Sequence, residues 1–143
     1  MFSNDRSQLR QLFYQAWEGR QTGRPLEPLE MQIADIVAQH PEYHALLADE
    51  SQRDRDYLPE NGETNPFLHM AMHLALREQL ATERPAGIGR IHARLCRQLG
   101  ETHAAEHRMM DCLAEALWQS QRQGRPPDEP AYLACLRRLA DGG

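Results

Sequence analysis

The chain has 143 residues, with 16 basic against 21 acidic side chains and a formal net charge of −5. This acidic balance argues against a nucleic-acid-binding protein, which normally carries a basic face. All the basic residues are arginine, so the chain has no lysine for Schiff-base chemistry or for a phosphate-binding loop. Mean hydropathy is −0.72, and no apolar run approaches the ~18 residues of a membrane-spanning helix.

The cysteines and the N-terminal sequence bear on the compartment. The chain starts MFSNDRSQLRQLF, which lacks the basic-then-apolar pattern of an export signal. Cys96, Cys112 and Cys135 form no CxxC pair, and an odd, scattered set is more typical of reduced thiols than of a disulfide framework. We therefore expect a cytoplasmic protein with three free cysteines.

The N-terminal half reads as helical because its apolar residues recur at helical spacing and nowhere alternate for long. A first helix is expected over residues 5–18, ended by Gly19. A second is expected over 28–40. Pro41 then opens a short third helix that runs through Ala48, since proline is well tolerated at the first helical position.

The rest of the chain begins with a polar segment over 49–65, long enough to be a binding loop or lid. Asn65 and Pro66 then form a strong helix start, with a capping side chain followed by proline. Further helices are expected over 66–81, 88–99, 102–122 and 129–140. The sequence thus predicts an all-α fold: one helical domain over 1–143, built as a bundle of four main helices plus short accessory helices.

The histidines show the clearest functional pattern. Six of the seven occur as HxxxH pairs on three separate segments. Residues four apart share one face of a helix, so both imidazoles of a pair can approach one metal ion. The three pairs are His40 and His44, His69 and His73, and His103 and His107.

The neighbours of these histidines place the imidazoles on apolar helix faces. His103 and His107 share a stripe with Leu117, and His73 shares one with Leu76. A buried polar group without a partner costs about 1–3 kcal/mol, and coordination of a shared ion would remove that cost. We therefore predict a mononuclear or dinuclear metal centre of several histidines, with candidate ligands His40, His44, His69, His73, His103 and His107.

Two carboxylates extend this ligand set. Asp111 follows His103 by eight residues on the same helix face, and Glu106 lies on the other edge of that stripe. Either side chain could bridge two ions or accept a hydrogen bond from an imidazole N–H. A set dominated by histidine suits a transition metal. Zinc or iron is expected here, with nickel and copper left open.

A second interpretation is a non-catalytic interaction or structural module whose core histidines are satisfied by hydrogen bonds. Methionines cluster beside the histidines, and methionine-rich faces adapt to partner helices, although methionine more often simply fills a core. The four are Met70, Met72, Met109 and Met110. Catalysis, substrate and association of identical copies stay open under both interpretations. His92, near Cys96, is expected to be an ordinary structural residue.

Four segments together resemble an uncharacterised bacterial family, domain of unknown function 1841. They are HPEYH, NPFLHMAMHLALREQ, HAAEHRMMDCLAEALW and GRPPDEPAYL, and the resemblance covers nearly the whole chain. It implies no activity. A looser resemblance is to hemerythrin-like helical-bundle metalloproteins, which use HxxxH pairs and an acidic ligand on facing helices. The chain departs from that pattern because HPEYH contains a proline and no second helix carries HxxxE, so oxygen carriage is not implied.

Overall fold

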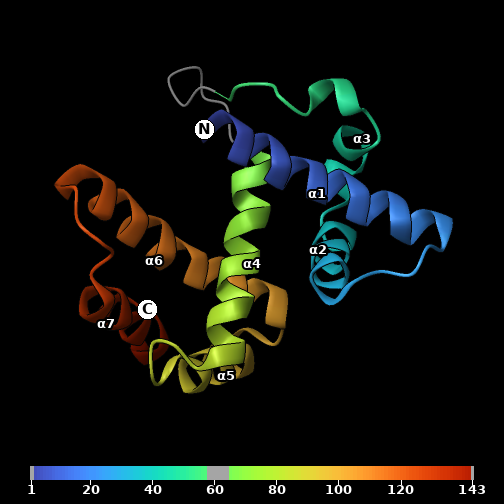
Figure 1. Ribbon diagram of the computed structural model, residues 1–143. Helices are drawn as coiled ribbons and strands as arrows, with labels where there is room; N and C mark the ends of the chain where they lie inside the picture. The colour runs from blue at the N-terminus through green and yellow to red at the C-terminus, as the bar shows by residue number, and fades with distance from the viewer. Residues whose placement is uncertain (1, 58–64, 143) are drawn as a thin grey trace. The chain divides into compact units, whose positions relative to one another are not determined.

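The computed structural model describes residues 2–57 and 65–142, and all regular structure within these ranges is helical (Figure 1). The prediction of an all-α fold is thus confirmed. The chain divides into two compact units, residues 1–74 and 75–143, and the boundary falls inside helix α4 (Pro66–Thr82). Within the same described ranges, no helix combines the length and the apolar character needed to cross a membrane.

The first unit packs helix α1 against helix α2. Its elements are α1 (Phe2–Thr22), α2 (Pro28–Ala38), the 3₁₀ turn η1 (Pro41–Tyr43), α3 (His44–Leu47), the 3₁₀ turn η2 (Glu50–Gln52) and the first part of α4. Aromatic and β-branched side chains supply most of the core, because they bury the largest apolar areas. Its centre consists of Phe13, Ala16, Trp17, Ile33, Ile36, Val37, Phe67 and Met70.

Helix α1 continues through Gly19, where the sequence predicted its end. The left-handed residue is Gly23, with φ of +78°. The N–H of Arg24 donates to the carbonyl of Gly19 at 2.9 Å, which completes a Schellman motif after Thr22. Gly19 instead leaves room for the Arg24 side chain, since a Cβ there would lie 2.5 Å from the guanidinium.

Side-chain caps fix the starts of α2 and α4. The backbone N–H of Glu27 donates to the Glu30 carboxylate at 3.0 Å, as part of a capping box that precedes α2. At α4, Oδ1 of Asn65 accepts hydrogen bonds from the N–H groups of Phe67 and Leu68 at 3.0 and 3.2 Å. The expected helix start at Asn65 and Pro66 is therefore confirmed.

The first part of the predicted polar loop is anchored to α1. The guanidinium of Arg10, which is only 2% exposed, donates from Nη1 to the carbonyls of Arg53 and Arg55, both at 2.7 Å. Because these bonds fix the backbone of residues 49–57, this stretch is ordered structure rather than a free loop. Residues 58–64 of the predicted loop lie outside the described residues.

The second unit contains the rest of α4 and three helices that pack on one another: α5 (Ile88–Leu99), α6 (Thr102–Gln123) and α7 (Glu129–Gly142). Their bounds lie close to the predicted ranges. Left-handed glycines follow α5 and α6, and the Asp128 carboxylate accepts from the N–H of Ala131 at the start of α7. The core of this unit includes Leu76, Ile88, Leu95, Met109, Met110, Leu113 and Leu136.

The end of α6 differs from the prediction. Leu117, which the sequence places on the same inward stripe as His103 and His107, is 36% exposed, and the neighbouring Trp118 is 49% exposed. The last buried residue of α6 is Leu113, so its final turns extend beyond the core. At this exposed end, the Arg122 guanidinium lies 4.7 Å from the Trp118 ring and partly covers it.

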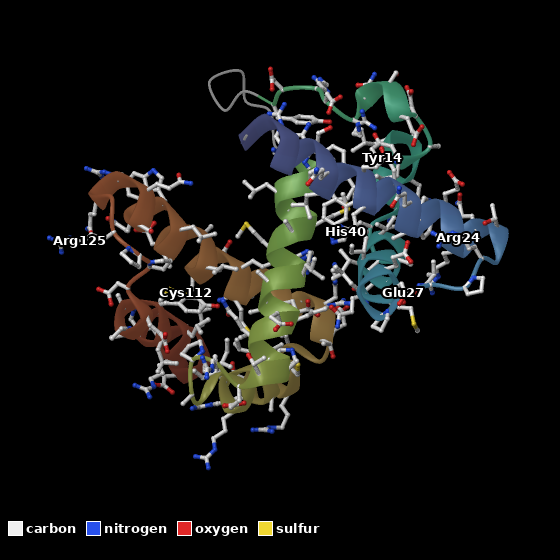
Figure 2. All side chains as sticks on the ribbon, viewed as in Figure 1. Tyr14, Arg24, Glu27, His40, Cys112 and Arg125 are labelled. Atoms are coloured by element: carbon white, nitrogen blue, oxygen red, sulfur yellow. A yellow bond between two sulfur atoms is a disulfide. The ribbon has the colours of Figure 1, made fainter. Side chains whose placement is uncertain are left out.

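A disulfide joins Cys112 of α6, which is labelled in Figure 2, to Cys135 of α7, and the two Cα atoms are 5.8 Å apart. Cys96 is a free thiol. The expectation of three reduced cysteines is therefore wrong. Residue spacing could not reveal this pair, because packing of α6 on α7 brings together residues 23 positions apart. The cytoplasmic location, which rested partly on reduced thiols, stays a prediction.

Candidate metal centre

His40 lies between α2 and η1, where Pro41 prevents the helix from continuing. Its side chain is 3% exposed. Its Nδ1 lies 2.8 Å from Oε2 of Glu42, and its Nε2 lies 3.0 Å from Nε2 of His73. Because the Glu42 carboxylate can only accept, Nδ1 carries the proton, and Nε2 is the nitrogen that His40 presents to His73.

Two further imidazoles of the first unit come from α4. His73 is fully buried and His69 is partly buried, and their ring centroids are 4.9 Å apart across one helical turn. Each of these rings also lies 5.0 Å from the ring of His40. The ring of Tyr43 stacks on the ring of His40, with the two centroids 5.2 Å apart. The first unit thus gathers three imidazoles and a phenol.

The electrostatics of this group centre on Glu42. The hydrogen bond with His40 holds the pKa of the Glu42 carboxyl below its usual range, against the raising effect of burial. Burial also raises the pKa of the Tyr43 hydroxyl, so that group stays neutral. Glu42 is therefore an anion hydrogen-bonded to the outer nitrogen of His40, an arrangement that makes an imidazole a better metal ligand.

The second unit contributes its own pair. His103 and His107 lie on the first turns of α6, with ring centroids 4.2 Å apart and planes inclined by 65°. Both side chains are partly buried. The four-residue spacing thus places two imidazoles on one face of the helix, as the sequence pattern indicates.

His44 has a different role from His40. Its Nε2 donates to the carbonyl of Val37 at 2.8 Å, and its ring stacks on Trp17 with centroids 4.5 Å apart. The four-residue rule does not apply to His40 and His44, because Pro41 starts a 3₁₀ turn and α3 begins only at His44. His44 therefore satisfies a carbonyl in the last turn of α2.

The two predicted carboxylates lie in distinct environments on α6. Glu106 is 4% exposed, and its Oε1 lies 3.3 Å from Nε of Arg77, so the two form an ion pair within the second unit. Asp111 is exposed. Sequence reasoning missed a third carboxylate, Glu42. Its signal was an acidic residue two positions after His40, across a proline turn that brings the two side chains together.

The remaining residues singled out in the sequence have structural places. His92 contacts Cys96 along α5, with Nε2 3.6 Å from Sγ. Met70 and Met109 are fully buried and Met110 is 4% exposed. These three methionines therefore fill the cores of the two units, and none of them forms an exposed adaptable face.

Among known protein families, residues 5–138 match the family described as domain of unknown function (DUF1841). No curated protein and no solved structure matches the chain. The match covers nearly all of the sequence and specifies no activity, substrate or metal. The chemistry of the site must therefore be inferred from the histidines and their surroundings.

Proposed function

The chain belongs to the DUF1841 family, which brings no activity with it, and we propose from its own residues that it binds one transition-metal ion. The proposed ligands are His40 and His73 together with His103 and His107.

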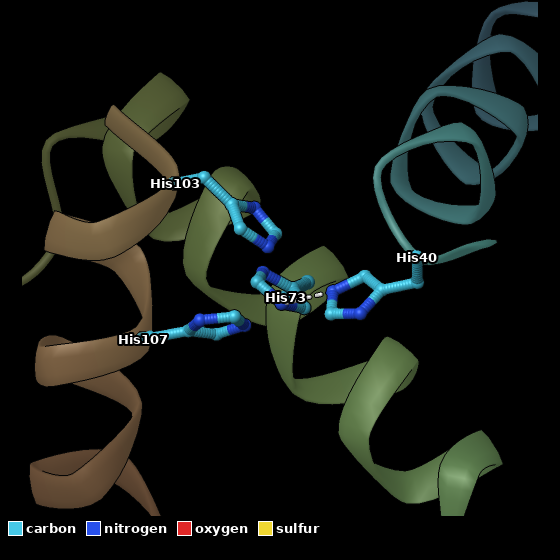
Figure 3. A group of neighbouring side chains, drawn as sticks. All are labelled: His40, His73, His103 and His107. Atoms are coloured by element: carbon cyan, nitrogen blue, oxygen red, sulfur yellow. Dashed lines mark hydrogen bonds between the residues drawn. The ribbon is translucent and has the colours of Figure 1, made fainter. Parts of the chain in front are cut away.

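The observation that carries the proposal is the donor group drawn in Figure 3. Each of the four histidines offers one ring nitrogen, and these nitrogens lie within 4.8 Å of one another. Two ligands of one tetrahedral ion, each about 2.0–2.1 Å from it, lie roughly 3.4 Å apart. The His40 and His73 nitrogens, which both belong to the first unit, are 3.0 Å apart and thus close to that spacing.

The donor set supports zinc or iron. Four neutral imidazoles leave the positive charge of the ion uncompensated, and the nearby anion is Glu42, which bonds to the outer nitrogen of His40. Imidazole is a borderline ligand that suits zinc, iron, nickel and copper better than magnesium or calcium. Four such ligands close the shell of tetrahedral zinc, which would then be structural, whereas six-coordinate iron would keep two positions for water or a small substrate.

The test is metal analysis of the full chain purified without an affinity tag. About one equivalent of zinc or iron is expected per chain, because imidazole sites of this kind bind metal tightly at neutral pH. His73→Ala and His107→Ala should each lower that content strongly. His92→Ala is the matched control, since His92 is a partly buried helical histidine outside the proposed group.

Two results would overturn the proposal. One is less than about a tenth of an equivalent of any transition metal, both after purification and after incubation with zinc or with iron(II) under anaerobic conditions. The other is equal metal content in the wild type and in the two histidine variants.

The alternative is a structural or interaction module whose histidines are satisfied by hydrogen bonds. It is favoured by one observation: the 3.0 Å separation of the His40 and His73 nitrogens is also that of a hydrogen bond. The methionines give it no support, since three of the four lie in the cores. Under this alternative the chain would fold fully in the presence of a chelator, and metal would leave its stability unchanged.

A further inference from the structure

A groove of about 380 Å³ lies between α6 and α7, and both cysteines of the disulfide line it. Cys112 is only 2% exposed, whereas Cys135 is partly buried. Thiol–disulfide exchange requires an attacking thiolate to reach one sulfur of the bond. The groove therefore offers access to the disulfide, and Cys135 provides the more accessible of its two sulfurs.

The walls of the groove carry charges of both signs. Arg138 of α7 and Glu115 of α6 are exposed and line it, together with Asp128 at the start of α7. The Glu115 carboxylate accepts a hydrogen bond from Gln119, which holds it along the helix surface. A guanidinium binds a carboxylate well, and a carboxylate binds an ammonium group. The groove thus matches a small molecule that carries both a carboxylate and an ammonium group.

We propose that this groove is a thiol–disulfide exchange site for a zwitterionic low-molecular-weight thiol. The thiolate of the small molecule attacks Sγ of Cys135, the Cys112–Cys135 bond breaks, and Cys112 leaves with the electron pair and takes up a proton. A second molecule of the same thiol then attacks the sulfur of the first. Cys135 is released and protonated, and the two small molecules leave as their own disulfide. The protein is reduced by two electrons, and two thiols are oxidised.

This inference does not depend on the proposed metal site, because the disulfide and the groove belong to α6, α7 and the segment that joins them, and none of the four proposed metal ligands lines the groove. The volume is large enough for a ligand of this size, since small-molecule sites usually measure about 300–1,000 Å³. Structural disulfides resist reduction by small thiols, whereas disulfides that are accessible to solvent are more often the labile ones. The presence of both cysteines in the wall of one groove distinguishes the present bond from that case.

The experiment uses the full chain with Cys96→Ser, so that Cys112 and Cys135 are its only cysteines, in the presence of a metal chelator. Reduced glutathione is the zwitterionic probe and 2-mercaptoethanol the uncharged one, compared at equal thiolate concentration. Aliquots are alkylated and counted by mass spectrometry. We expect glutathione to reduce the folded protein about fivefold faster, the factor that one exposed ion pair can supply. A mixed disulfide on Cys135 should appear first.

Arg138→Ala should remove the preference for glutathione and leave the rate with 2-mercaptoethanol unchanged. Arg137→Ala is the matched control, since it removes a neighbouring exposed arginine of α7 that lines a different groove. The proposal is overturned if both thiols react at equal rates, or if Arg138→Ala behaves like Arg137→Ala. It is also overturned if reduction occurs only at the rate of global unfolding, as shown by a steep dependence on urea.

Discussion

Nε2 of His40 lies 3.0 Å from Nε2 of His73, and the other nitrogen of His40 is bound to Glu42. Two imidazole nitrogens at this distance either share one proton or share one metal ion, because both cannot hold a proton there. The two states differ in a measurable way. A shared proton needs nothing from solution, whereas a shared ion makes the stability of the protein depend on metal concentration.

The first prediction follows from that difference. Zinc added to chelator-treated protein should raise the free energy of unfolding by about 2.7 kcal/mol when free zinc is a hundredfold above its dissociation constant. Thermal unfolding followed by circular dichroism measures this. His40→Ala should abolish most of the increase, and His92→Ala should keep it. An identical response of His40→Ala and the wild type would show that zinc binds elsewhere.

The second prediction concerns Glu42, whose carboxylate accepts from Nδ1 of His40. Glu42→Gln keeps the shape and replaces the anion by a neutral amide. Loss of such an outer partner lowers metal affinity about 10- to 100-fold, because the ligating imidazole becomes less basic and less well oriented. Competition with a chromophoric chelator measures the affinity. Glu50→Gln is the control, since this exposed glutamate is bonded to Gln11 rather than to a histidine. Equal affinity in Glu42→Gln and the wild type would argue against His40 as a ligand.

Much of the helical fold could be predicted because local signals determine it. Asn65 and Pro66 start α4, and the left-handed Gly100 and Gly124 end α5 and α6. Each of these signals acts on backbone groups only a few residues away in the sequence. The end of α1 was predicted at the wrong glycine, because Gly19 and Gly23 offer the same local signal. The sequence does not show that the Arg24 side chain lies against Gly19, so it could not tell which glycine ends the helix.

The site was predictable only in part. Pairs within one helix, such as His103 and His107, follow from helical periodicity. His44 was grouped with His40 on the same rule, but the 3₁₀ turn at Pro41 breaks the periodicity and sends His44 to the carbonyl of Val37. Glu42 was missed because its contact depends on that same turn. The disulfide was missed because tertiary packing, and no local pattern, joins Cys112 to Cys135.

The third prediction concerns Arg10, whose buried guanidinium donates to two backbone carbonyls and lies 4.6 Å from the ring of Phe67. Desolvation is the main reason that its pKa is lowered, which marks a charge held in an apolar setting. Arg10→Met leaves the carbonyls of Arg53 and Arg55 without this donor. We expect a loss of about 2–4 kcal/mol in the free energy of unfolding.

Urea unfolding in a Trp118→Phe background measures this loss, because Trp17 is then the only tryptophan and lies in the core of the first unit. Arg6→Met is the matched control. Arg6 pairs with Asp56 at 2.9 Å, but both side chains are largely exposed, so its removal should cost no more than about 0.5 kcal/mol. Similar losses in the two variants would show that Arg10 acts as an ordinary surface arginine.

The fourth prediction is a loss of stability in alkali that originates from two buried tyrosines. Burial raises the pKa of Tyr14 and of Tyr132 to about 12. The Tyr14 hydroxyl lies 3.0 Å from the carbonyls of Leu46 and Asp49, and the Tyr132 hydroxyl donates to Gln79 at 2.7 Å. In the unfolded chain each hydroxyl ionises near pH 10, so between pH 10 and 12 the folded state holds more protons than the unfolded state.

The contribution of these two groups to the free energy of unfolding is therefore constant below pH 10. It falls as the pH rises toward 12, by up to about 2 kcal/mol for each tyrosine. Tyr14→Phe should cost about 1 kcal/mol at pH 8 through its lost hydrogen bond, but it should flatten the alkaline decline. Tyr132→Phe should act in the same way, and the double variant should remove most of the decline. Urea unfolding measured between pH 8 and 12 tests this, and an alkaline decline as steep in the double variant as in the wild type would assign it to other groups.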